Sequence, residues 1–225
     1  MANAPTGRAS TARKARLDRE SIVAAALELA SAPGATSVSF RELGSHLGVD
    51  PTAVYRHFRS KDELMGALFD HVTEIGLDAM DAPPEQWQER LRQLALRSRD
   101  AFGHYPAVGA EAMLLTTNGV AEHRAMETIL DAFTRAGLDG DELVRHYALF
   151  AMQVLSGSAN VARARARRPD ESDTLWLDAP LIVDPREFPL IARNASQLAE
   201  LDDEALFLAG IDMVIASAER AAAAS

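Results

Sequence analysis

The chain has 225 residues, of which 48% are hydrophobic and 25% charged, and this composition excludes wholesale disorder and collagen-like repeats. It contains no cysteine, which excludes disulfides, thiolate metal sites and cysteine nucleophiles. The net charge of −10 hides a split, because residues 1–61 carry nine Lys and Arg against five Asp and Glu, whereas residues 62–225 are strongly acidic. Such a split favours a basic binding module on an acidic body.

Residues 1–17 begin the chain with small and polar residues and four cations. Such a composition buries too little apolar surface to become ordered, so we expect a flexible basic arm. The arm either adds phosphate contacts or remains a solvated tail. It lacks the apolar middle of a signal peptide, and charges interrupt every later apolar stretch well before the roughly 18 residues of a membrane helix. We therefore expect a cytoplasmic protein with no membrane partner.

Two helices are predicted next. The first begins after Asp18, a suitable N-cap, and ends at the Pro-Gly pair 33–34. The second begins at Ser39, which has Glu42 three residues later, the spacing of a capping box. Gly48 then ends the second helix, because glycine permits a turn conformation that a Cβ would penalise.

A third helix is predicted to begin at Pro51, with Asp50 as its N-cap. Gly44 is small where the second and third helices cross, and Val54 and Phe58 face inward. Two short helices joined by a glycine-containing turn form a helix-turn-helix. Four residues remain outward on the third helix, free to enter a major groove: Thr52, Ala53, Arg56 and His57.

A long fourth helix is predicted to follow, opened by a second capping box of Ser60 and Glu63. Apolar residues recur along this helix with helical spacing and mark its buried face: Leu64, Leu68, Val72 and Ile75.

Helical apolar spacing continues beyond Pro83, and no window shows sustained strand alternation. The predicted fold class is therefore all-α. Residues 169–185 are an exception, a long acidic connection that contains Trp176 and is of a length that is usually functional or disordered. The further helices are expected near 85–103, 107–117, 121–136, 140–167, 186–199 and 203–223.

The run LGVDPTAVYRHFRSKDELMGAL, residues 47–68, resembles the signature of the tetracycline-repressor (TetR) family of bacterial regulators. Members of that family combine a three-helix DNA-binding head with a larger helical body that dimerises and binds an inducer. The run HYPAVGAEAM from His104 also resembles the body of the tetracycline-type repressors. After the arm at 1–17, which composition predicts, the resemblance implies a helix-turn-helix DNA-binding domain at 18–62 and a ligand-binding and dimerisation domain at 63–225.

The resemblance also places eight residues at DNA. Arg56 is the strongest candidate for direct reading, since Arg to guanine is the commonest specific contact. Tyr55 has the alternative of a core residue, and His57 that of a plain surface histidine. By position, Ser39 and Arg41 fall near backbone phosphates, Thr52, Ala53 and Arg56 at base-reading positions, and Tyr55, His57 and Lys61 at phosphates.

The resemblance further implies an inducer pocket in the body. A pocket of this kind is mostly apolar with a few polar groups, although residues at helical spacing also have the alternative of plain core packing. His104 stands where the tetracycline-type repressors use a histidine near the ligand, so metal-assisted binding stays open, and Trp176 is a candidate lid. The candidate lining residues are Phe102, His104, Tyr105, Met113, Leu114, Asn118, Phe133, Tyr147, Phe150 and Gln153.

Small residues are frequent in the predicted helices at 140–167 and 203–223, and they allow close helix approach. The resemblance makes these two segments the interface of a homodimer, with intramolecular packing as the alternative. The residues concerned are Ala148, Ala151, Ser156, Gly157, Ala159, Ala205, Ala209, Gly210 and Ala216.

These features together predict a DNA-binding repressor that a small-molecule inducer releases from a double-stranded palindromic operator. We expect no catalytic residue, no protein metal site and no resident cofactor. One alternative is a helical enzyme, but the sequence lacks H-E-x-x-H, G-x-S-x-G and G-x-x-x-x-G-K patterns. Another alternative is a helical protein-interaction module whose head has lost DNA binding.

Overall fold

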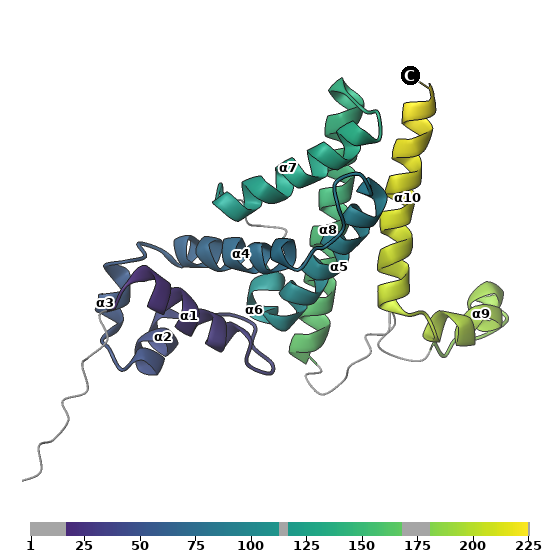
Figure 1. The fold of residues 1–225 in the computed structure, drawn as a ribbon. Helices are drawn as coiled ribbons and strands as arrows, with labels where there is room; N and C mark the ends of the chain where they lie inside the picture. The colour runs from purple at the N-terminus through teal and green to yellow at the C-terminus, as the bar shows by residue number, and fades with distance from the viewer. Residues whose placement is uncertain (1–16, 113–116, 168–180, 225) are drawn as a thin grey trace, which may run out of the picture.

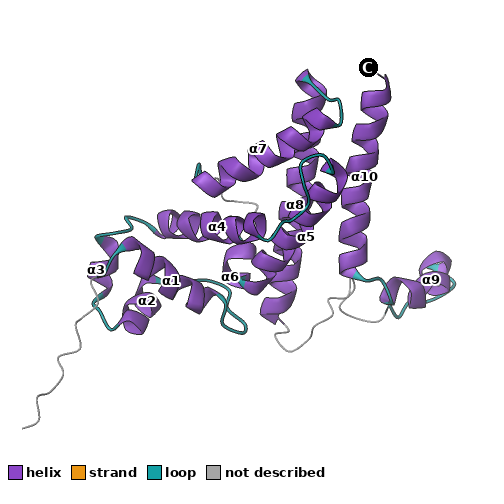
Figure 2. Cartoon of the chain, in the orientation of Figure 1, coloured by secondary structure: helices purple, strands orange, loops and turns teal. Residues whose placement is uncertain are grey.

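The structure, a computed structural model, describes residues 17–112, 117–167 and 181–224, and over these ranges it contains helices and no strand (Figures 1 and 2). The predicted all-α class is therefore confirmed. The expected arm at 1–17 lies almost wholly outside the described residues, as does Trp176. The helices are α1 (Arg19–Ala30), α2 (Phe40–Leu47), α3 (Pro51–Tyr55), α4 (Lys61–Asp78), α5 (Trp87–His104), α6 (Pro106–Gly109), α7 (Val120–Arg135), α8 (Gly140–Arg167), α9 (Pro189–Ala199) and α10 (Asp203–Ala224).

The ends of the head helices follow the local sequence. Asp18 accepts a hydrogen bond from the backbone amide of Ser21 and caps α1. Ser39 and Glu42 form the predicted capping box of α2, and Gly48 ends that helix in the left-handed region with φ 65°. A Cβ on Gly44 would lie 3.0 Å from the Val49 carbonyl oxygen. Glycine at that position therefore lets the turn pack against α2.

The second predicted capping box is only half formed. Ser60 accepts a hydrogen bond from the Glu63 amide at 3.1 Å, as expected. The Glu63 carboxylate does not return to Ser60; it accepts from the Arg59 amide at 2.8 Å and from Arg19 at 2.7 Å. The expectation of a reciprocal box is wrong because Arg19, 44 residues earlier in the chain, supplies a charged partner for that carboxylate.

Helix α4 runs from the head to the body (Figure 1). Leu64, Leu68 and Val72 are fully buried as predicted, whereas Ile75 is 38% exposed. Ile75 was expected in the buried stripe, and that expectation is wrong because α4 turns its buried face to different partners along its length. Near the head it packs with α1 and the start of the body, and Leu77 near its end joins a second apolar cluster.

The body is built around that second cluster, which joins α5, α7, α8 and α10. The segment predicted as helical at 107–117 contains only the four-residue α6, and residues 113–116 lie outside the described ranges. Helix α9 contains no buried residue and lies to one side of the body (Figure 1).

Candidate DNA-binding surface and effector cavity

The recognition helix α3 is short and tightly capped. Asp50 accepts hydrogen bonds from the Thr52 amide at 2.8 Å and from the Thr52 hydroxyl at 2.7 Å. These bonds, the side-chain one first, hold the pKa of Asp50 below its ordinary value. Pro51 occupies the first turn, where a missing amide hydrogen costs nothing. The candidate base-reading residue Thr52 is exposed, but its hydroxyl is already engaged with Asp50.

The two sides of α3 differ sharply in exposure. Val54 and Phe58 are fully buried, as predicted. Tyr55 is 54% exposed and presents its ring to Phe40 at 4.4 Å between centroids, so the alternative of a core tyrosine is wrong. Arg56 is exposed beside it. Tyr55 and Arg56 thus form an outward face that is held in place by the buried Val54 and Phe58. Ala53 and His57 are both half-buried at the margin of this outward face.

A residue that was not predicted from the sequence holds the end of α3 in place. Arg19 donates from Nη1 to the His57 carbonyl and to Glu63, and its guanidinium lies 4.0 Å from the centre of the Phe58 ring. These three partners lie 38 or more residues away in the chain. No local spacing links them, so only the folded head shows this role.

The remaining candidate DNA residues lie at the starts of α2 and α4. Ser39 donates its hydroxyl to Glu42 at 2.6 Å, and this bond is the main reason why the pKa of Glu42 lies below its ordinary value. Arg41 is exposed. Lys61 is also exposed, and its Nζ lies 3.3 Å from Oε1 of Glu111, which belongs to the body.

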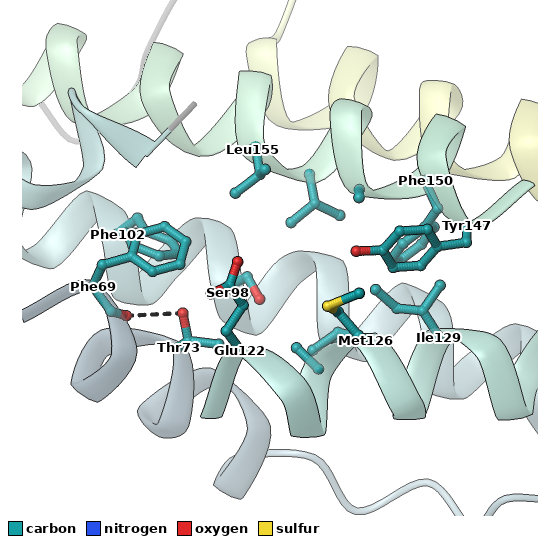
Figure 3. Close-up of a pocket in the computed structure, with 14 residues that line it drawn as sticks. Phe69, Thr73, Ser98, Phe102, Glu122, Met126, Ile129, Tyr147, Phe150 and Leu155 are labelled. Atoms are coloured by element: carbon teal, nitrogen blue, oxygen red, sulfur yellow. Dashed lines mark hydrogen bonds between the residues drawn. The ribbon is translucent and has the colours of Figure 1, made fainter. Parts of the chain in front are cut away.

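Helix α4 and three helices of the body line a cavity of about 100 Å³ (Figure 3). Its walls come from α4, α5, α7 and α8, and most of the lining is aromatic or aliphatic. The lining residues are Phe69, Thr73, Leu94, Ser98, Phe102, Glu122, Ala125, Met126, Ile129, Tyr147, Phe150, Ala151, Val154 and Leu155.

A few polar groups interrupt this apolar lining. Tyr147 directs its hydroxyl into the cavity, and Ser98 and Glu122 contribute oxygen atoms (Figure 3). Burial, and secondly the charge of Glu122, raise the pKa of Tyr147. One oxygen of Glu122 accepts from the amides of Thr117 and Asn118 at 2.8 and 2.7 Å. The lining therefore holds one carboxylate and three hydroxyls, of which that of Thr73 donates to the Phe69 carbonyl.

The structure brings only some of the sequence candidates to this cavity. Phe102, Tyr147 and Phe150 line it, and Phe133 is fully buried in the adjacent core. Met113 and Leu114 lie outside the described residues. The contributions of α4 and α7, such as Phe69 and Met126, were not predicted from the sequence. Their helical spacing is that of ordinary core residues.

The other candidates lie elsewhere. His104 is exposed at the end of α5, with its ring against the half-buried Tyr105. Asn118 is exposed and adopts a positive φ of 51°, and its amide is bound by Glu122. Gln153 lines a separate hollow between α8 and α10. The expectation that these four residues face one pocket is not met, because His104 is exposed as the last residue of α5 and Gln153 packs toward α10, where a Cβ on Gly210 would strike it.

The small residues of α8 and α10 divide between two roles. A Cβ on Gly157 would strike the Phe207 ring, and a Cβ on Gly210 would strike Gln153. Ala159 is 1% exposed. For these three positions the alternative of intramolecular packing is correct. Ala148, Ser156, Ala205 and Ala209 remain exposed on the outer faces of the two helices.

Two kinds of feature are absent from the described ranges. No helix there is long and apolar enough to cross a membrane. No cluster of three or more His, Asp or Glu side chains with the arrangement of a metal site occurs there either.

Comparison with known proteins agrees with this architecture. Residues 22–68 match the family model of bacterial regulatory proteins of the tetR family, and residues 81–220 match that of the tetracyclin repressor-like C-terminal domain. The tetracycline repressor protein class D of Escherichia coli is 30% identical over 209 residues, covering 89% of this chain and 88% of the repressor. The chain therefore belongs to the tetR family of bacterial regulatory proteins and is a DNA-binding transcriptional regulator of the ligand-responsive kind.

Solved structures support the same assignment. The transcriptional regulator SCO7222, a TetR from Streptomyces coelicolor, is 28% identical, with a TM-score of 0.69 over 91% of this chain and 99% of that one. ActR from the same organism, in complex with actinorhodin, has a TM-score of 0.74 at 22% identity and covers 92% of this chain and 99% of its own. At that identity ActR establishes the shared fold alone.

Proposed function

We propose that this chain is a repressor that binds a palindromic operator as a homodimer and is released by a small, mainly apolar effector. The observation that carries the proposal is the exposed face of α3, where Tyr55 and Arg56 stand outward over the buried Val54 and Phe58. A helix held in this way can enter a major groove without unfolding the head. The chromosomal target in turn makes the cytoplasm its place of action.

Within this proposal the eight candidate residues keep separate roles. Thr52, Ala53 and Arg56 read bases. Backbone phosphates are met by Ser39 and Arg41 at the start of α2, by Tyr55 and His57, and by Lys61 at the start of α4. Phosphate contacts fix the register of the head, whereas base contacts carry the sequence preference.

Dimerisation rests on the outer faces of α8 and α10. Large apolar side chains are exposed there, including Met152 at 55% and Met213 at 73%. They lie beside the exposed small residues Ala148 and Ala209, which let a second copy approach closely. Two heads held about one DNA turn apart would then read the two halves of a palindrome.

The effector acts through the cavity between α4 and α7. A volume of about 100 Å³ is below the roughly 300–1,000 Å³ of small-molecule sites. We propose that an effector of ordinary size widens this cavity by moving its walls apart. One wall is α4, which carries Phe69 and Thr73 in the cavity and Lys61 at its head end. Effector binding in the cavity and DNA binding by the head thus favour different positions of α4. By linkage, DNA must weaken effector binding by the same factor by which the effector weakens DNA binding.

Two solved proteins of the same fold hold organic molecules. ActR was solved with actinorhodin, and a TetR from Acinetobacter baumannii with minocycline. Both crystal structures show that this fold accommodates an organic molecule. For the present chain, the apolar walls and the oxygen atoms of Ser98, Glu122 and Tyr147 favour a small, mainly apolar compound with a few hydroxyl or amine groups.

Selection of operators from random DNA, followed by release tests with a panel of compounds, tests the proposal. We expect a palindromic consensus and at least one compound that lowers operator affinity. Failure to enrich any consensus would contradict sequence-specific binding. A compound that binds tightly and leaves DNA affinity unchanged would contradict the effector mechanism, since equal affinity for both states shifts neither.

A further inference from the structure

One ion pair joins the DNA-binding end of α4 to the body. Lys61 is the first residue of α4, and Glu111 follows α6, 50 residues later in the chain. The ammonium nitrogen of Lys61 lies 3.3 Å from Oε1 of Glu111, and their side chains are 46% and 32% exposed. The cation assigned to a DNA phosphate therefore already has an anionic partner in the absence of DNA.

We propose that Glu111 is a positioning residue that competes with DNA phosphate for Lys61 and so lowers the affinity of the free protein for DNA. This inference rests on the proposed function, in which Lys61 contacts a phosphate. In this inference the Glu111 carboxylate of the body acts directly on the charge of Lys61, and the effector cavity takes no part.

The physical reason is that a phosphate and a carboxylate cannot both approach one exposed ammonium without repelling each other. At 3.3 Å the Glu111 carboxylate lies well within the screening length of about 10 Å at 0.1 M salt. DNA binding must either displace Glu111 from Lys61 or place a phosphate beside it. Both outcomes cost affinity, and the cost falls as salt rises.

The other acidic residues at the start of α4 do not take this role. Glu63 is held by the Arg59 amide and by Arg19, whose cation compensates its charge. Asp62 directly follows Lys61, and adjacent residues on a helix do not face each other. Among the described residues, Glu111 is the carboxylate with an ion pair to Lys61.

The position of Glu111 makes the effect adjustable. Lys61 is the first residue of α4 and Glu111 follows α6, so any shift of α6 relative to α4 would change the distance between the two charges. Beyond about 10 Å, salt screens their attraction and Lys61 becomes free for phosphate. The pair thus acts as an electrostatic brace that weakens DNA binding in the arrangement seen here.

The test measures binding of the full-length protein to a random-sequence duplex of ~40 base pairs, because a phosphate contact does not depend on sequence. Glu111→Gln should tighten binding about twofold to fivefold at ~50 mM salt, the range of an exposed ion pair. The gain should shrink at ~300 mM salt because of screening. Matching thermal unfolding midpoints confirm that the variants remain folded.

Two further variants show whether tighter binding comes from loss of the ion pair with Lys61 or simply from loss of one negative charge. Glu127→Gln removes the same charge from an exposed position on α7 and should change affinity much less. Lys61→Ala should weaken binding and lower the salt slope by about 0.9 for each phosphate that the protein no longer neutralises. Adding Glu111→Gln to Lys61→Ala should then bring little further gain, because the partner through which Glu111 acts is absent.

Each contrary result has a distinct meaning. An equal gain from Glu127→Gln, or a full gain from Glu111→Gln in the Lys61→Ala background, overturns the brace and leaves the proposed function intact. If Lys61→Ala weakens DNA binding but Glu111→Gln does not tighten it, the brace is again overturned and the proposed function stands. No effect of either Lys61→Ala or Glu111→Gln overturns the brace and removes Lys61 from the phosphate-binding residues. A wild-type protein that binds no DNA overturns the brace and the proposed function together.

Discussion

The guanidinium of Arg19 lies 4.0 Å from the centre of the Phe58 ring. This contact places the first residue of α1 against the buried residue that anchors the end of the recognition helix. The same guanidinium bonds the His57 carbonyl and Glu63. One side chain of α1 therefore ties the segment that follows α3 to the first turn of α4.

Replacing Arg19 should weaken DNA binding without changing sequence preference. Arg19→Ala should reduce the free energy of unfolding by about 1–2 kcal/mol, the lower range for a partly exposed cation–π contact together with two hydrogen bonds. Arg19→Lys should recover only part of the loss, because an ammonium cannot stack and fork like a guanidinium. Denaturant unfolding and operator selection check the two effects, and an altered consensus in Arg19→Ala would contradict a purely positioning role.

The Glu63 carboxylate should make stability depend on pH in the acid range. Its pKa lies below the ordinary value, first because the Arg59 amide donates to it and then because Arg19 does. A group with a lowered pKa stabilises the fold above its unfolded pKa, about 4.3 for Glu, and this contribution is lost as the pH falls through the folded pKa. Unfolding of wild type and Glu63→Gln should therefore differ most near neutral pH and converge at low pH. A difference that does not depend on pH would contradict this account.

Arg56→Ala should behave differently from any change at Arg19. Loss of a bidentate contact to a base should cost about 1–3 kcal/mol per half-site and relax the preference at one base pair. Operator selection with the variant gives the answer directly. If the variant selects the same consensus as the wild type, Arg56 does not read a base and at most contacts the DNA backbone.

The crossing of α8 and α10 should not tolerate a methyl group at Gly157. A Cβ there would strike the buried ring of Phe207, and overpacking of this kind costs about 1–3 kcal/mol. Gly66→Ala on α4 is the matched control, because its Cβ would meet Thr117 at an ordinary 3.7 Å. The control should stabilise the protein by about 0.4–1 kcal/mol, as Gly to Ala usually does where the backbone permits it. Thermal unfolding distinguishes the two, and a stabilised Gly157→Ala would show that Phe207 can move aside.

Tyr147 should titrate above the ordinary tyrosine range. Burial raises its pKa first, and the Glu122 charge raises it further. The chain has three tyrosines, so a Tyr55→Phe, Tyr105→Phe double variant reports on Tyr147 alone by ultraviolet absorbance. A raised pKa contributes stability below the unfolded value of about 10 and loses it as the pH rises through the folded value. Adding Glu122→Gln should bring the midpoint partly down, and an unshifted midpoint in the double variant would contradict burial as the main cause of the raised pKa.

The head could be predicted from the sequence far better than the body. Capping at Asp18 and Ser39, the turn at Gly48 and the close approach at Gly44 are decided within a few residues of chain. The contacts of Arg19 span about 40 residues, and no local pattern contains them.

The cavity was difficult to predict for a similar reason. It forms where four helices meet, and residues such as Phe69 and Met126 follow the same spacing as ordinary core residues. Helical spacing indicates which side chains face inward but not where the packing leaves space. His104 shows the converse error, since a match to a family position does not fix the direction of a side chain at the end of a helix.

The apolar cluster of the head does not stop at residue 62. It continues through Leu64 and Phe69 of α4 to Phe102 and Val108 of the body. If recombination joined this head to an unrelated body at residue 62, the apolar residues of the head would lose their partners in α4 and in the body. The new body would offer side chains that do not fit them. Exchange of DNA specificity between such regulators should succeed mainly by substitutions on the outer face of α3, which leave that core untouched.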